Sequence, residues 1–219
     1  MAEKSRKELK VERNKKIIID TAESLFEEYG FERISMDQIA DASYFSKTTV
    51  YKYFKSKEDI YLALAIRAYS KIIEEFQKEL DNEKSGIDLT FNMGMAFFRF
   101  FTNYPLYRKA LNYTAEKSMH QDKDKDLKSL SKALMVELNL QQQRFIEIWM
   151  NAINRGINDN TIKSDFPPQL LAFIIARMTT GFLDELSQSE ELLHYFSLSI
   201  KEMFEIGLKI IKEGIKIEK

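Results

Sequence analysis

The sequence predicts an all-α protein, and three observations support that fold class. The 219 residues include only three prolines and seven glycines, which leaves few helix breakers. Apolar residues recur at helical spacing over long segments, whereas the period-two alternation of strands is hard to find. Three helix-start signals also follow one another between residues 35 and 58, which forces two very short helices. We therefore expect an N-terminal three-helix helix-turn-helix domain followed by a larger C-terminal helical domain.

The first helix is expected over residues 10–29. Ile18, Ala22, Leu25, Phe26 and Tyr29 form its apolar stripe, and Gly30 follows in the position of a C-terminal cap. Residues 1–9 are rich in basic side chains, and we interpret them as a disordered arm that is solvated or lies along phosphates.

The next two helices are short and closely spaced. Ser35 is a good N-cap, and Gln38 three residues later completes a capping box. Ser46 is positioned to cap the following helix after a turn over residues 43–45. Each cap is flanked by apolar residues at the two positions of a hydrophobic staple, which fixes how the chain enters the helix. This spacing is typical of a helix-turn-helix, whose second helix enters the DNA major groove.

The remaining elements are longer. Ser56 caps a fourth helix over residues 57–80, with Asp59 at the box position. Its apolar residues cover more than one face, so we expect it to connect two domains, 1–56 and 57–219. Pro105 separates a fifth helix from a short sixth, and a charged loop over 122–126 precedes a seventh helix that begins near Asp126 and is closed by Gly156. The eighth helix begins at the proline pair 167–168 and continues to about 187, and the ninth runs from a cap at 189 to near 214.

Charge is concentrated in the helix-turn-helix. The whole chain has a net charge of −1, but residues 43–57 contain four lysines and no acid. Val50 and Phe54 are spaced i, i+4, so one face of the second short helix is buried and the lysines, threonines and tyrosines of the other face point outward. A lysine run is often only a solvated face, but this spacing favours contact with DNA.

Two kinds of DNA contact are expected. Hydroxyls and amides at helix starts suit phosphates, and we assign that role to Ser35, Ser46, Tyr51 and Lys57. The outward face of the second short helix suits base edges, and we assign base reading to Lys47, Thr48, Thr49 and Lys52. Tyr53 completes the predicted DNA-binding set.

These residues resemble the N-terminal DNA-binding domain of TetR-family (tetracycline-repressor-like) transcriptional regulators. The resemblance covers about residues 10–65. The chain departs from the family at Tyr44 and Thr48, two positions where the family usually has glycine. The operator sequence of a relative therefore cannot be assigned to this protein. The resembling segments are the run DTAESLFEEYGF from Asp20 to Phe31, then Ile39-Ala40, Ser46-Lys47, Thr49 to Tyr51, Tyr53-Phe54 and Lys57-Glu58.

The resemblance implies a ligand cavity in the C-terminal domain. A run of aromatic residues over 91–113 is more often protein core than pocket, and the pattern alone leaves both open. In the family this cavity lies between helices five to eight. The expected ligand is hydrophobic and flat or long-chained, and Gln142 and Arg177 are its expected polar anchors. The expected apolar lining is Met95, Phe98, Phe101, Tyr104, Tyr113, Phe145, Trp149 and Phe173.

The resemblance also implies a homodimer that binds a palindromic operator and is released from it by the ligand. We expect the dimer to form through the last two helices, where Gly181 and Gly207 would permit close helix crossing. The expected contact face of the ninth helix comprises Phe196, Ile200, Met203, Gly207 and Ile210. The alternatives are a non-sensing architectural DNA-binding protein, which would bind without sequence preference, and a helical adaptor or membrane-surface protein.

Composition argues against several other classes. The chain has no cysteine, so disulfides, thiol nucleophiles and cysteine-based metal sites are excluded. His120 and His194 lack ligand-like neighbours, and no nucleophile elbow or phosphate loop is present, so we expect no metal, no cofactor and no enzymatic activity. The N-terminus does not resemble a signal peptide, and the most apolar segment, 170–176, is far shorter than the roughly 20 residues of a membrane span. We therefore expect a cytoplasmic protein without membrane contact.

Overall fold

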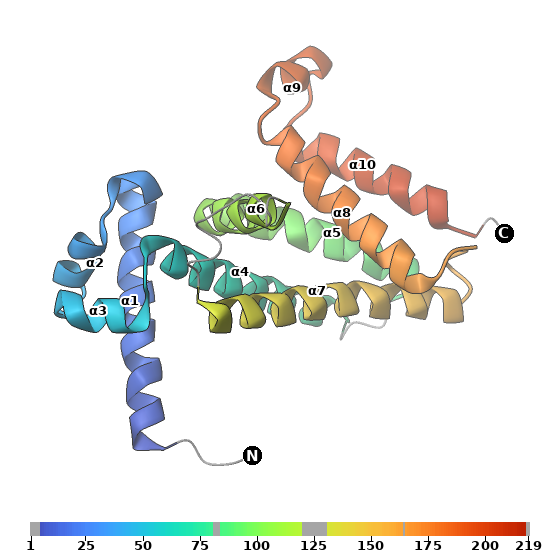
Figure 1. Cartoon of the computed structure of the whole chain (residues 1–219). Coiled ribbons are helices and arrows are strands. Elements are labelled where there is room, and N and C mark those ends of the chain that lie inside the picture. Colours follow the sequence, from blue (N-terminus) through green and yellow to red (C-terminus); the bar gives the residue numbers. More distant parts are fainter. Residues whose placement is uncertain (1–4, 81–83, 120–130, 164, 218–219) are drawn as a thin grey trace. The chain divides into compact units, whose positions relative to one another are not determined.

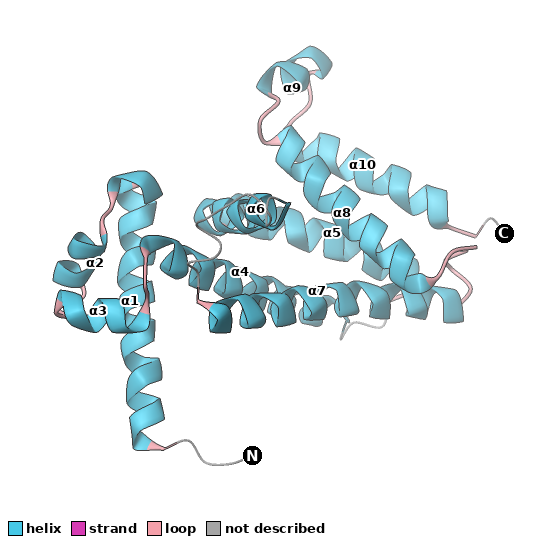
Figure 2. Ribbon diagram, in the orientation of Figure 1, coloured by secondary structure: helices cyan, strands magenta, loops and turns pink. Residues whose placement is uncertain are grey.

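The computed structural model describes residues 5–80, 84–119, 131–163 and 165–217. The described residues are almost entirely helical, as Figures 1 and 2 show, which confirms the predicted fold class. Their regular elements are α1 (Arg6–Tyr29), η1, a 3₁₀ helix (Phe31–Arg33), α2 (Met36–Ala42), α3 (Lys47–Tyr53), α4 (Lys57–Leu80), α5 (Gly86–Asn103), α6 (Pro105–Met119), α7 (Lys132–Asn158), α8 (Pro168–Leu186), α9 (Glu190–Phe196) and α10 (Ile200–Ile215). None of these helices combines the length and apolar composition that crossing a bilayer requires.

The chain forms two compact units. The first contains residues 1–68 and 105–139, and the second contains residues 69–104 and 140–219. The first unit extends past residue 56, where we placed the domain boundary, because α6 and the beginning of α4 pack with the N-terminal helices. Both α4 and α7 contribute one part to each unit.

The start of α1 corrects the predicted disordered arm. Ser5 accepts a hydrogen bond from the backbone N–H of Glu8, and the Glu8 carboxylate accepts one from the backbone N–H of Ser5. This capping box begins the helix at Arg6, so residues 6–9 are helical rather than disordered. Gly30 ends α1 as predicted, with a positive φ of 84° that suits glycine.

The core of the first unit joins α1, α4 and α6. Phe26 of α1 packs its ring edge-on against Tyr61 of α4. Further along α4, Arg67 forms ion pairs with Asp20 and Glu23 of α1. Glu23 also accepts a hydrogen bond of 2.5 Å from the hydroxyl of Tyr107 in α6. The three helices are therefore held together by aromatic packing and by a partly buried charge network.

The second unit is built on close helix contacts. A Cβ at Gly86 would lie 1.9 Å from the backbone nitrogen of Gly156, so α5 and α7 approach backbone to backbone. Gly94 makes room for Leu208, and Gly207 makes room for the ring of Phe182, which allows α10 to pack on α5 and α8. Figure 1 shows α8 and α10 running side by side.

Three predictions about the C-terminal half need correction or fall outside the described residues. Gly156 lies inside α7, which continues to Asn158. The predicted single ninth helix is two helices, because Ser197 adopts a left-handed conformation with φ 53° and ψ 38° and ends α9. Ser199 then begins α10 with a capping box to Glu202. The predicted loop over 122–126, with Asp126 as a cap, lies outside the described residues.

Candidate DNA-binding surface and ligand core

The second short helix, α3, presents one buried face and one exposed face. The Ser46 hydroxyl caps it by accepting from the backbone N–H of Thr49 at 3.2 Å. Val50 is fully buried and Phe54 is 1% exposed, which confirms the predicted anchoring face. The exposed residues of the helix are Lys47, Thr48, Tyr51 and Lys52. Thr49 differs from our expectation, since it is half-buried and its hydroxyl shares a 2.8 Å hydrogen bond with Ser46.

The helix before it is fixed by the predicted capping box. The Ser35 hydroxyl accepts from the backbone N–H of Gln38, and the Gln38 side chain accepts from the backbone N–H of Ser35 at 2.8 Å. The turn between α2 and α3 contains Tyr44, whose φ is 57° and whose side chain is 97% exposed. A positive φ is unfavourable for a non-glycine residue, so the tyrosine occupies a strained position at the exposed edge of the motif.

The first lysine of α3 has an acidic neighbour. Its ammonium forms an ion pair with Asp37 of α2, and this hydrogen bond raises the pKa of Lys47. Because both side chains are more than half exposed, the pair contributes little to stability and can be exchanged for a phosphate or a base edge. Lys52, one turn further along the exposed face, has no ion pair with an acid among the described residues.

Two other predicted DNA-binding residues are tied to the body of the first unit. The Lys57 ammonium donates to the carbonyl of Phe31 at 2.7 Å and lies 4.3 Å from the centre of its ring. The Tyr53 hydroxyl accepts from the amide of Asn14 at 3.1 Å. Both contacts orient the end of α3 and the start of α4 against η1 and α1.

Part of the predicted ligand lining is brought together in the second unit. Phe145 of α7 contacts Phe97 and stacks on Phe76, which in turn contacts Trp149. Phe101 joins this group through Phe97, with ring centres 4.1 Å apart. We call these five residues the aromatic core. Phe98 lies apart from it in a second cluster, stacked on Phe204, and Met95 is half-buried.

Both predicted polar anchors affect Tyr69 of α4, a residue that the sequence did not single out, although Arg177 is exposed and acts only through its charge. Burial raises the pKa of Tyr69, while a side-chain hydrogen bond from Gln142 and the charge of Arg177 oppose that shift. Tyr69 also packs edge-on against Phe145 of the aromatic core. Its position in the apolar stripe of α4, seven residues before Phe76, was the available signal.

The remaining predicted lining residues are placed differently. Tyr104 is 42% exposed and Phe173 is 52% exposed on α8, so neither is enclosed in the second unit. Tyr113 belongs to the first unit, where its ring contacts Tyr61 and Phe31.

Two buried polar atoms of the second unit lack a hydrogen-bond partner among the described residues. They are the indole nitrogen of Trp149 and the hydroxyl oxygen of Thr179, in residues that are 0% and 1% exposed. An unpaired buried donor costs about 1–3 kcal/mol, so such atoms call for an explanation. The described residues contain no cluster of three or more histidine, aspartate or glutamate side chains that would hold a metal ion.

One segment of the chain matches a known protein family. The model of the family described as bacterial regulatory proteins, tetR family, matches residues 18–64. The transcriptional repressor KstR2 of Mycolicibacterium smegmatis is 23% identical over 155 residues, which cover 70% of each chain.

Solved structures share the fold over nearly the whole chain. The ketosteroid transcriptional regulator KstR2 of Mycobacterium tuberculosis is 17% identical, with a TM-score of 0.58 over 93% of this chain and 95% of that one. The transcriptional regulator FadR of Bacillus subtilis, solved in complex with stearoyl-CoA, is 18% identical, with a TM-score of 0.61 over 91% of this chain and 98% of that one. The segment 18–64 therefore matches the tetR family of bacterial regulatory proteins, and the chain shares the fold of these two solved transcriptional regulators over nearly its whole length.

Proposed function

We propose that this protein is a repressor that binds a palindromic operator as a homodimer and is released from it by a hydrophobic ligand. The observation that carries the DNA part is the two-faced α3, anchored by Val50 and Phe54 and open to solvent along its lysines, Thr48 and Tyr51. A helix anchored in this way projects its exposed side chains as one rigid surface, which base reading in the major groove requires.

The structure refines the expected roles along α3. Lys47, Thr48 and Lys52 remain the candidates for base reading, since all three are exposed. Tyr51 is 49% exposed and places its hydroxyl at the same surface, where it suits a phosphate. Lys57 would have to leave its contact with the Phe31 carbonyl to reach a phosphate, so we expect a smaller contribution from it.

The DNA experiment separates base contacts from phosphate contacts. Affinity for a library of half-sites is measured at several salt concentrations for Thr48→Ala, Lys52→Ala and Tyr51→Phe, with Lys78→Ala as the control. We expect Thr48→Ala or Lys52→Ala to cost about 1–3 kcal/mol on the preferred site and to relax one position of it. Tyr51→Phe should weaken binding to all sites equally. If every variant only scales affinity uniformly, α3 does not read bases.

The homodimer is supported by an exposed apolar stripe on α8 and α10. Two of these side chains, Met178 and Ile210, are 51% and 68% exposed. Gly181 continues the stripe on α8, and no atom of the described residues lies within 4 Å of a Cβ placed there, so another helix can approach closely. The other members of the stripe are Leu170, Phe173, Ile174 and Ile206.

Monomers expose such stripes rarely, and a second copy of the chain would cover it. Sedimentation should therefore find a dimer at micromolar concentration, and Met178→Glu combined with Ile210→Glu should give monomers. A wild-type monomer at that concentration would exclude the dimer.

The ligand part rests on the aromatic core and on the indole nitrogen of Trp149, which lacks a hydrogen-bond partner among the described residues. No described residue offers an acceptor to this nitrogen inside an otherwise apolar cluster, and a ligand oxygen would supply one. Tyr69, Gln142 and Arg177 would contact a polar group at one end of the same ligand. The complex of FadR with stearoyl-CoA and the description of KstR2 as a ketosteroid regulator both favour a large apolar ligand.

Trp149 is the only tryptophan, so its fluorescence reports on the core directly. The probes are stearoyl-CoA and a 3-ketosteroid, added at micromolar concentration to the free protein and to its complex with DNA. We expect one of them to change the emission of Trp149 and to dissociate the complex, with Gln142→Ala weakening both effects. A ligand shifts the DNA equilibrium only by its differential affinity for the two states, so binding without release would contradict the proposed regulation.

A further inference from the structure

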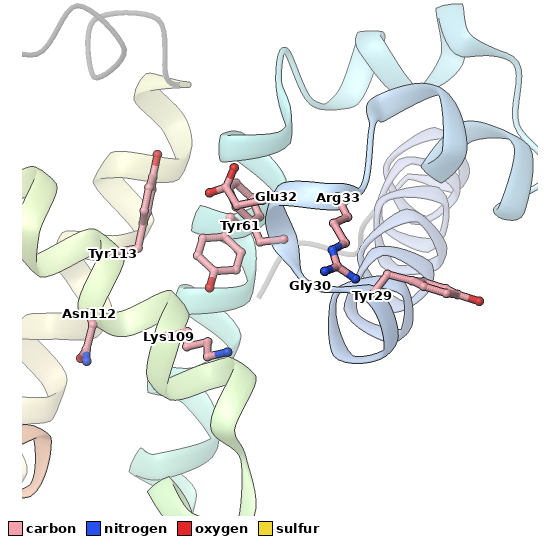
Figure 3. Close-up of a pocket in the computed structure, with 9 residues that line it drawn as sticks. Tyr29, Gly30, Glu32, Arg33, Tyr61, Lys109, Asn112 and Tyr113 are labelled. Atoms are coloured by element: carbon pink, nitrogen blue, oxygen red, sulfur yellow. The ribbon is translucent and has the colours of Figure 1, made fainter. Parts of the chain in front are cut away.

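A pocket of about 590 Å³ lies in the first unit, and it includes neither the exposed face of α3 nor the aromatic core. It opens between the turn after α1, the 3₁₀ helix η1 and the side of α6 (Figure 3). None of its lining residues belongs to the predicted DNA-binding set, and Tyr113 alone belongs to the predicted ligand set. Its volume lies within the range of small-molecule sites, about 300–1,000 Å³.

The floor of this pocket is aromatic. Tyr61 is 4% exposed, and its ring lies 4.3 Å from the ring centre of Phe31 and 5.3 Å from that of Tyr113. Phe31 and Tyr113 are only half-buried, so their rings border the open space. A planar ring placed there would pack against several aromatic rings at once.

The buried tyrosine directs an unused hydrogen-bond donor into the pocket. Among the described residues, the Tyr61 hydroxyl has no hydrogen-bond partner, although the residue is almost fully buried. In Figure 3 this hydroxyl points toward the side of the gap where Lys109 and Asn112 lie. Burial raises the pKa of Tyr61 to about 12, so the hydroxyl keeps its proton at neutral pH and can donate it to an anion.

Two cations from different elements stand at the rim. Arg33 belongs to η1 and Lys109 to α6, and both heads point into the gap in Figure 3. Both are exposed, and neither forms an ion pair with an acid in the described part of the chain. Glu32 also lines the pocket, but its carboxylate points away from Arg33 in the same view. The rim therefore favours a single negative charge on the side of Arg33 and Lys109.

We propose that this pocket binds a planar aromatic carboxylate, as a second small-molecule site separate from the aromatic core. The carboxylate would accept hydrogen bonds from the Arg33 guanidinium, the Lys109 ammonium and the Tyr61 hydroxyl, and the ring would lie against Phe31 and Tyr113. A flat aromatic acid matches both the rings and the cations, whereas an aliphatic acid would leave the rings uncovered.

The site has a consequence for DNA binding, and this consequence alone rests on the proposed function. The ligand would bridge η1, which leads into the helix-turn-helix, and α6, and Gly30 between α1 and η1 lines the same pocket. Occupancy would favour the arrangement of these elements in which both cations reach the carboxylate. Ligand binding would then change the affinity for the operator by a factor. This factor equals the ratio of the ligand affinities of the DNA-bound and the DNA-free protein.

The test is a calorimetric titration of the full chain with 2-naphthoate, compared with the neutral 2-naphthamide. We expect one naphthoate per chain and no measurable binding of the amide at the same concentrations. Arg33→Gln and Lys109→Gln should each weaken binding about tenfold or more, because each removes a charge-assisted contact. Tyr61→Phe keeps the ring and should weaken binding less. Lys201→Gln, an exposed residue of α10 in the other unit, is the matched control and should have no effect.

Three results would overturn the assignment: no binding of naphthoate at millimolar concentration, equal binding of the amide, or unchanged affinity in both the Arg33 and Lys109 variants. Thermal unfolding of each variant verifies that it is folded. Operator binding measured without naphthoate tests the proposed function independently, so failure of the pocket and failure of the repressor proposal give different results.

Discussion

The hydroxyl of Tyr107 provides a direct test of how α1, α4 and α6 are held together. Tyr107 is 2% exposed, and its hydroxyl donates to Glu23 at 2.5 Å. Burial raises the pKa of Tyr107 well above its ordinary value, so the donor stays protonated over the whole range of stability. Tyr107→Phe removes the hydroxyl and leaves the packing of the ring in place. Glu23 keeps its ion pair with Arg67.

The expected cost follows from these contacts. A hydrogen bond to a charged group contributes about 1.5–3 kcal/mol. The Glu23 side chain is 19% exposed, so water recovers part of that amount. We therefore expect the free energy of unfolding to fall by about 1–2 kcal/mol, which corresponds to a decrease in melting temperature of roughly 2–8 °C for a chain of this size.

The assay is urea unfolding followed by circular dichroism. Tyr195→Phe is the matched control, because Tyr195 is 80% exposed and should tolerate the same change without loss. A double-mutant cycle with Glu23→Gln isolates the contact itself, and the two substitutions should be clearly non-additive. An unchanged stability of Tyr107→Phe, or strict additivity in the cycle, would refute the role assigned to this hydrogen bond.

Three further predictions concern single positions. Gly86→Ala should lower the free energy of unfolding by about 2 kcal/mol or more, because its Cβ would meet the backbone of Gly156. Gly214→Ala, whose Cβ would have no described atom within 4 Å, should be neutral or stabilising in the same urea assay. Tyr44→Gly should leave stability unchanged or raise it by up to about 1 kcal/mol, since it relieves a positive φ and removes a side chain that is 97% exposed; a clear loss of stability would contradict the strain. The hydrogen bond with Lys212 lowers the pKa of Asp88 in the folded protein below its ordinary value of 3.8. The ionised carboxylate therefore stabilises the fold above pH 3.8, and this stabilisation is lost as the pH falls through the pKa of the folded state. Asp88→Asn should therefore cost roughly 0.5–1 kcal/mol at neutral pH, because the side chain is half exposed, and the difference from wild type should vanish in acid unfolding curves below about pH 3.

The sequence by itself determined the local elements whose signals are contained in a few neighbouring residues. The Ser35–Gln38 capping box, the Ser46 cap and the end of α1 at Gly30 were all predicted correctly, because each depends on contacts within one helical turn. The start of α1 differs from the prediction, because the Ser5–Glu8 capping box extends the helix into the basic segment that was expected to be disordered.

Tertiary structure decided every feature that depends on residues far apart in the chain. The hydrogen bond of Gln142 with Tyr69 connects α7 with α4, and the removal of Tyr113 from the predicted ligand lining reflects the packing of α6 with the first unit. The pocket between η1 and α6 likewise combines Arg33 with Lys109, 76 positions later in the chain. Helical periodicity shows which face of each helix is apolar, but it does not say which other helix covers that face, since many partners satisfy the same pattern.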